Sequence, residues 1–147
     1  MTIICVKNGV MAADSYVFCG GIKWQAPVTK IFRHPQGLIG LSGEASDCYF
    51  VGRWWVSGGQ SYPPKLQDGE RSVGGLILDY EGVWLIDHRL EKWPTIDSSS
   101  VGNGDATSFC EGAMHAGASA EEAVRLAIKH CVYVGGDVQV ERLTLPE

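Results

Sequence analysis

The sequence predicts an α+β fold in which two β-sheets pack on each other and helices cover them from outside. Short apolar runs joined by turn signals fill the first 43 residues, and helical periodicity begins only after them. Strands return in the middle, two helices follow, and an alternating strand closes the chain. This order favours a layered sandwich, although an open α+β sheet with one covered face fits it as well.

Two hairpin signals predict the first four strands. Apolar residues 2–6 and 10–14 flank Asn8-Gly9, a pair that accepts the positive φ angles of a type I′ turn. A second hairpin is expected to join 28–33 to 38–42 through a Pro-Gln-Gly turn.

Helical spacing of apolar residues predicts the first helix over 44–56, ended by Gly58-Gly59. Residues 57–71 are expected to form a loop, because Pro63-Pro64 excludes a helix interior. Ser119 and Glu122 form a capping box before the last helix. The other expected elements are strands at 73–79 and 83–87, a short apolar stretch at 93–96, a polar link at 97–100, helices at 105–116 and 119–130, and a strand at 137–145.

Length and composition limit the classes of function. The 147 residues suffice for one domain, residues 1–147, with a core of its own. The net charge is −5 and Lys and Arg form no cluster, so we expect no nucleic-acid partner. No stretch approaches the roughly 18 apolar residues of a membrane span, and the first residues lack the features of a secretory signal. We therefore expect no membrane contact and a cytoplasmic location.

The five cysteines stand far apart, and no C-x-x-C pair occurs among them. Structural zinc sites use closely spaced ligand pairs. We therefore expect free thiols and no metal site.

The first candidate for catalysis is Thr2, which directly follows Met1. Methionine aminopeptidases remove the initiator when the second residue is small, so we expect Thr2 to become the N-terminus, with no leader before it except Met1. Its hydroxyl is a weak nucleophile until a base takes the proton, and its own α-amino group, with a pKa of about 8, can be that base. Since Thr is also an ordinary second residue, the hypothesis depends on companion residues.

Asp14 and Lys30 are the companions, and each lies in a stretch that otherwise resembles a buried strand. Such charged side chains are rarely buried unless they are paired. A Lys30 ammonium held by Asp14 beside Thr2 would favour the deprotonated alcohol and keep the amine neutral. The alternative is that both side chains point outward from half-exposed strands.

Two glycine-rich junctions between a strand and a helix complete the candidate set. Gly43 stands where a strand gives way to a helix, and a glycine there can bring a backbone N–H close to a substrate, as an oxyanion hole requires. The stretch GNGD at 102–105 is a junction of the same kind. Either junction could also be a tight turn and nothing more.

Taken together, these residues resemble the proteasome β-subunit and HslV family of N-terminal-nucleophile hydrolases, as a short bacterial- or phage-type member. The similarity lies in segments that follow one another in the family's order: TII with GVMAADS, TKIF, GLIGLSGEASD, VGNGDATSFCEGA, SAEEAVRLAI and CVYVGGD. The resemblance implies a four-layer αββα sandwich. Its first helical layer is expected to be reduced, because the loop at 57–71 takes the place of a helix.

The resemblance also implies the reaction, amide hydrolysis through an ester acyl-enzyme. Thr2 would be the nucleophile and, through its amine, the base. Lys30 would activate the Thr2 nucleophile electrostatically, Asp14 would orient Lys30, and the N–H of Gly43 would hold the oxyanion. Asn103 stands where the family commonly has a serine between two glycines. An asparagine donates and accepts hydrogen bonds but cannot relay a proton as a hydroxyl does.

Protein or peptide substrates, a homo-oligomeric ring and an ATP-dependent unfoldase are the partners that the resemblance implies. It implies no cofactor and is compatible with a structural monovalent cation. Two other functions fit the same fold, namely a catalytically silent ring or scaffold protein and a small-molecule amidase. The joint presence of Thr2, Asp14, Lys30 and Gly43 favours the peptidase.

Overall fold

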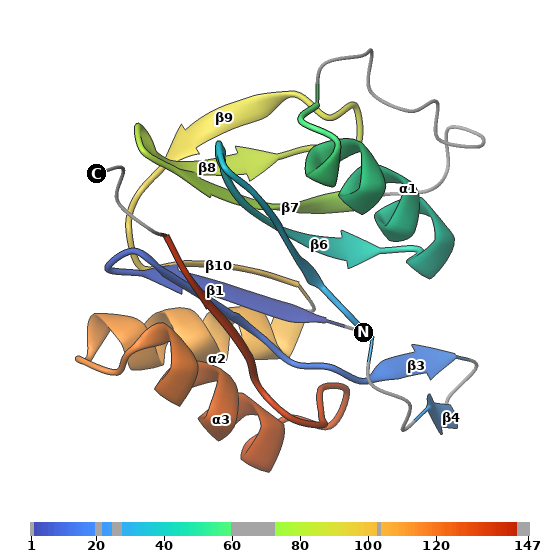
Figure 1. The fold of residues 1–147 in the computed structure, drawn as a ribbon. Coiled ribbons are helices and arrows are strands. Elements are labelled where there is room, and N and C mark those ends of the chain that lie inside the picture. Colours follow the sequence, from blue (N-terminus) through green and yellow to red (C-terminus); the bar gives the residue numbers. More distant parts are fainter. Residues whose placement is uncertain (1, 20–21, 25–27, 60–72, 103, 144–147) are drawn as a thin grey trace.

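Two antiparallel sheets lie face to face in the computed structural model, which describes residues 2–19, 22–24, 28–59, 73–102 and 104–143 (Figure 1). The first sheet has the strand order β10-β1-β2-β11 and the second β5-β6-β7-β8-β9, while β3 and β4 form a small hairpin. The strands are β1 (Ile3–Lys7), β2 (Val10–Ala13), β3 (Val17–Cys19), β4 (Ile22–Trp24), β5 (Ile31–His34), β6 (Gly37–Gly43), β7 (Val73–Asp79), β8 (Gly82–Ile86), β9 (Lys92–Thr95), β10 (Ser99–Gly102) and β11 (Gln139–Arg142).

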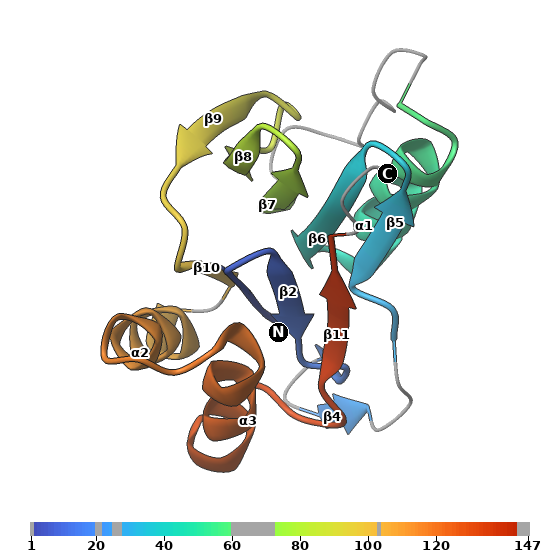
Figure 2. The same cartoon turned by 60° about the vertical axis from the view of Figure 1, so that its left-hand side comes forward.

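Helices cover the outer faces of both sheets. Helices α2 (Gly104–His115) and α3 (Ala120–His130) pack on the first sheet, and α1 (Ala45–Val56) packs on β5 and β6 of the second (Figures 1 and 2). The expected αββα sandwich is therefore confirmed, and the open sheet is excluded. Within the described ranges α1 is the sole helix on its side, as expected for a reduced first helical layer.

The central strand β1 is buried on both faces, which explains its continuous apolar sequence. Ile3 and Cys5 point toward α2 and α3, whereas Ile4 and Val6 lie in the apolar layer between the sheets. The sheets approach closely at Gly40, where an added Cβ would lie 2.6 Å from Cγ2 of Ile4. This packing holds the start of β1, which Thr2 directly precedes, against the second sheet.

The local predictions with the strongest turn and capping signals are confirmed. Asn8 and Gly9 have φ values of +52° and +73°, as a type I′ turn requires. The Ser119 hydroxyl accepts a hydrogen bond from the Glu122 amide at 3.0 Å, and the Glu122 carboxylate accepts one from the Ser119 amide.

The polar link expected at 97–100 is wrong in part, because Ser99 and Ser100 open strand β10 and pair with β1. Their side chains are buried, and each hydroxyl finds a backbone acceptor: Ser100 Oγ donates to the Thr107 carbonyl at 2.8 Å. Satisfied hydroxyls allow a polar sequence to form a strand whose serine side chains are buried.

Other boundaries differ from the sequence-based expectations. Strand β5 begins at Ile31 rather than at 28, and β11 is shorter than the range 137–145. The loop expected at 57–71 falls mostly outside the described residues.

None of the helices in the described ranges is long and apolar enough to cross a membrane. Four cysteines whose side chains the structure describes, Cys5, Cys48, Cys110 and Cys131, are free.

Candidate active site

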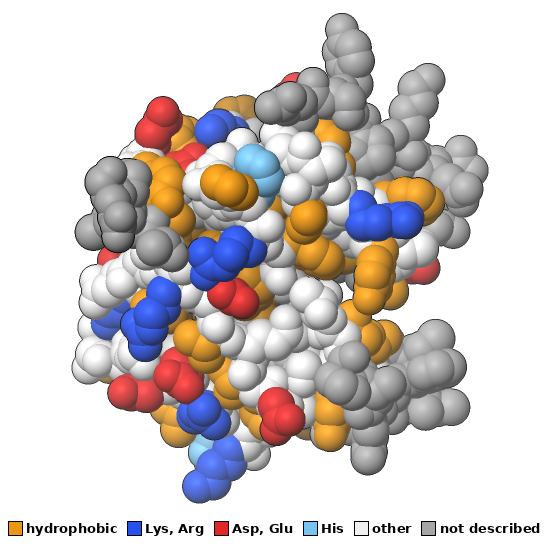
Figure 3. Space-filling model, in the orientation of Figure 1, with side chains coloured by type: hydrophobic (Ala, Val, Ile, Leu, Met, Phe, Trp, Pro, Cys, Tyr) orange, Lys and Arg blue, Asp and Glu red, His pale blue; other side chains and the backbone are white. Residues whose placement is uncertain are grey.

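Thr2 precedes β1 and borders a cavity of about 170 Å³. Only 8% of the Thr2 surface is exposed, and Thr2 is one of the residues that line the cavity. Lys30 and Gly43 border the same cavity, together with the first turn of α1. The surface is hollowed at its right-hand edge, below α1 (Figure 3). Three of the predicted site residues are therefore brought together at one concave place.

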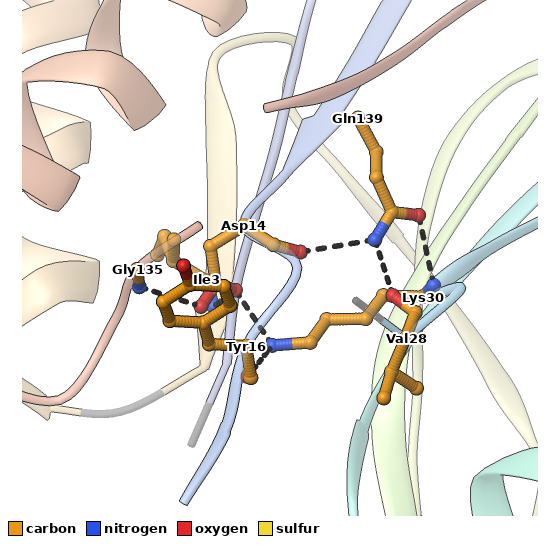
Figure 4. Close-up of polar contacts among 7 residues, drawn as sticks. All are labelled: Ile3, Asp14, Tyr16, Val28, Lys30, Gly135 and Gln139. Carbon is orange, nitrogen blue, oxygen red and sulfur yellow. Dashed lines mark hydrogen bonds and ion pairs between the residues drawn. The ribbon is translucent and has the colours of Figure 1, made fainter. Parts of the chain in front are cut away.

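Asp14 follows the end of β2, next to the start of β1, and is completely buried. Its Oδ1 accepts hydrogen bonds from the Ile3 amide at 3.1 Å and from Lys30 Nζ at 2.8 Å. Its Oδ2 accepts one from the Gly135 amide at 3.1 Å (Figure 4). One carboxylate thus joins the start of β1, the loop after α3 and the lysine.

Lys30 is 5% exposed and reaches inward to this carboxylate, so the two charges do not point outward. Nζ also donates to the Tyr16 carbonyl at 2.7 Å. Burial lowers the pKa of the Lys30 ammonium below its ordinary value, and the Asp14 carboxylate offsets part of that shift. The site therefore holds a buried cation at the wall of the cavity that Thr2 also borders.

Gly43 is the last residue of β6 and has a φ of +137°, a conformation that favours glycine. It leads through Glu44 into α1, whose first amides have no partner within the helix. Backbone N–H groups at such a junction suit a developing negative charge. Asn103 lies outside the described residues, and its role stays a prediction, as do the roles of Thr2 and Gly43.

Three residues at or near the cavity could not be identified as part of the site from the sequence alone. Gly135 contributes a backbone amide to Asp14, and Gln139 of β11 holds the backbone around Lys30. Cys48 of α1 borders the cavity and is a second possible nucleophile there. Burial, with the nearby Asp47 carboxylate, raises the pKa of the Cys48 thiol to about 11. We therefore expect the Cys48 thiol to be protonated at neutral pH.

Gly102 sets the place of Thr2 from the other side. It pairs with Ile3 in the β1–β10 ladder, and an added Cβ would overlap the Thr2 carbonyl oxygen. We expect Gly102→Ala to lower the free energy of unfolding by about 2 to 4 kcal/mol, from overpacking and from strain at its φ of +148°. Gly104→Ala is the matched control, because its Cβ would meet nothing within 4 Å. Urea unfolding of both variants checks this, and equal stabilities would contradict the close approach.

The fold can be compared with that of solved structures. HslV from Trypanosoma brucei superposes with a TM-score of 0.69 over 96% of this chain and 98% of its own, at 19% sequence identity. The chain has the fold of HslV. The protein BPH from Thiobacillus denitrificans superposes with a TM-score of 0.67 over 98% of this chain and 99% of its own, at 21% identity. BPH in complex with epoxomicin gives a TM-score of 0.65 over 99% and 100% of the two chains, at 21% identity.

Sequence comparison alone does not reach this result. A scan against models of known protein families finds no match, and neither does a search of curated protein sequences. The HslV-like fold is therefore shown by the comparison of structures.

Proposed function

We propose that the chain is a threonine-type peptidase whose nucleophile is Thr2, exposed by removal of Met1. The observation that carries the proposal is the Asp14–Lys30 ion pair, buried at the wall of the cavity that Thr2 borders. A buried, paired cation beside a hydroxyl suits the activation of a weak nucleophile. The HslV-like fold supports the same class of chemistry.

We infer the reaction from the chemistry of these groups and from the HslV-like fold. The Thr2 oxygen attacks the carbonyl carbon of the scissile amide while its proton passes to the Thr2 amine. The oxyanion that forms is stabilised by the N–H of Gly43 and by the charge of Lys30. The amine returns the proton to the leaving nitrogen, the C–N bond breaks and an ester remains on Thr2. Water then attacks the ester, and the free hydroxyl is regenerated.

Assembly and partners belong to the same proposal. We infer a homo-oligomeric ring that acts on unfolded proteins or peptides in the cytoplasm, with an ATP-dependent unfoldase supplying the substrate. The HslV-like fold supports the ring. The face drawn in Figure 3 shows Lys and Arg interspersed with acidic side chains. This face therefore gives no support to a nucleic-acid partner, which would need clustered cations.

The proposal is tested with the purified chain, short fluorogenic peptides and an unfolded protein. We expect hydrolysis of the peptides and of the protein, and loss of both activities in the presence of epoxomicin, the ligand with which BPH was solved. Hydrolysis of small amides but of no peptide would replace the peptidase by an amidase. Absence of all amide hydrolysis from a chain that has lost Met1 would leave a silent scaffold protein.

A further inference from the structure

Gln139, the first residue of β11, reaches from the first sheet to the segment that leads into the second. Its Nε2 donates to the Asp14 carbonyl at 3.2 Å and to the Val28 carbonyl. Its Oε1 accepts a hydrogen bond from the Lys30 amide at 2.9 Å (Figure 4). One side-chain amide therefore contacts the backbone of both members of the buried ion pair.

The geometry of these bonds resembles strand pairing. Residues 28–30 precede β5 and belong to no strand. The Val28 carbonyl and the Lys30 amide are the groups that a neighbouring strand would engage opposite Thr29. The Gln139 amide supplies one acceptor and one donor to them, as a backbone residue would. On the other side, the Lys30 carbonyl accepts the Leu41 amide at 3.0 Å, so the backbone of Lys30 is held from both sheets.

Only an amide of this length satisfies all three contacts. It offers two N–H donors and a carbonyl acceptor, and the two donors serve two different carbonyl groups. A carboxylate in its place would offer no donor and would face two carbonyl oxygens. The edge strands of the two sheets meet here. Arg33 of β5 and Glu141 of β11 form an ion pair across this edge, with 2.6 Å between Nη2 and Oε2.

We propose that Gln139 is a positioning residue, which sets the place of Lys30 relative to Asp14 and Thr2 by bridging the two sheets. Gln139 does not border the cavity and touches no reacting atom. The effect of Gln139 on the rate of hydrolysis rests on the proposed function, whereas its effect on the position of Lys30 does not.

Four charged or titratable side chains face the lysine or border its cavity. Asp14 faces it from the end of β2 and Cys48 faces it from α1, while Glu44 and Tyr49 border the same cavity at the start of that helix. Gln139 adds no charge to this set. An uncharged replacement therefore changes the position and burial of Lys30 without adding an electrostatic partner.

The test compares Gln139→Met and Gln139→Glu with Val140→Ala. Met removes the amide at similar length, and Glu keeps the shape but loses both donors. Val140 packs on the side of α2 and α3, so Val140→Ala loosens the same strand without touching Lys30. We expect kcat to fall about 10- to 100-fold in both Gln139 variants, because misplaced catalytic groups cost factors of this size. The acid limb of the pH profile of kcat/KM is expected to move to higher pH, since a withdrawn Lys30 no longer lowers the pKa of the Thr2 amine.

A second readout needs no activity. In chains labelled with ¹³C at lysine Cε, the Lys30 resonance is expected to titrate below the ordinary lysine range in the wild type. In Gln139→Met it is expected to titrate closer to that range, because water reaches the ammonium. Val140→Ala, at a comparable fall in Tm, is expected to leave both the titration and the pH profile unchanged.

The outcomes separate this proposal from the proposed function. An unchanged Lys30 titration in a folded Gln139→Met chain would overturn the positioning role, and so would an equal change in Val140→Ala. If the wild type hydrolyses nothing, the peptidase fails, while the titration still decides the role of Gln139. If Gln139→Glu does not fold, the comparison of Gln139→Met with Val140→Ala tests the proposal by itself.

Discussion

Replacing Lys30 by methionine is expected to slow peptide hydrolysis by about 10²- to 10⁴-fold in a chain that still folds. Methionine keeps the length and apolar stem of the side chain but removes the cation beside Thr2. The hydroxyl and the amine then lose the electrostatic field that activates them. Hydrolysis of a fluorogenic peptide by the variant and the wild type, at the same concentration, measures the effect.

Stability has to be separated from catalysis in this variant. Removing one partner of a buried ion pair costs about 3 to 5 kcal/mol, and here the cost is expected at the lower end, because Asp14 keeps the amides of Ile3 and Gly135. Adding Asp14→Asn to Lys30→Met removes the unpaired charge but turns an NH2 donor toward the amide of Ile3 or of Gly135, so we expect little of the stability to be recovered. The double variant is expected to stay inactive. Activity above a tenth of the wild type in Lys30→Met would make the pair structural.

Replacing Thr2 by alanine is expected to have the largest effect, a loss of hydrolysis on the order of 10⁴-fold or more. The exchange removes the attacking oxygen and leaves the amine, the lysine and the cavity in place. Thr2→Ser keeps the hydroxyl and is the matched variant, for which we expect measurable turnover.

The fold provides the control for these two variants. Both substitutions remove a few atoms at the rim of the cavity, so the Tm of each is expected to stay close to that of the wild type. Equal rates of hydrolysis for Thr2→Ala and the wild type would remove Thr2 from the mechanism.

The features that depend on short stretches of sequence could be predicted. Asn8 and Gly9 specify a turn because both accept positive φ angles, and Ser119 specifies the start of a helix because its side chain caps it. The charges of Asp14 and Lys30 are conspicuous because each interrupts an apolar run, and the structure buries both. Such signals are readable because the physical cause lies within a few residues.

The supporting contacts could not be predicted in this way. Gln139 lies 125 positions after Asp14 along the chain, and Gly135 lies 121 positions after it. Their roles arise only when β11 pairs with β2 and brings the loop after α3 to the end of β1. Ser99 and Ser100 illustrate the same limit, because a polar sequence forms a buried strand once its hydroxyls find acceptors.

The central claim is that Thr2, freed of Met1, is the attacking group. Intact-mass spectrometry of the purified chain, before and after incubation with an electrophilic peptide inhibitor, tests it most directly. We expect the mass of residues 2–147 before incubation and one added inhibitor afterwards, which peptide mapping locates on Thr2. A chain that retains Met1, or an inhibitor found on another residue such as Cys48, would contradict the claim.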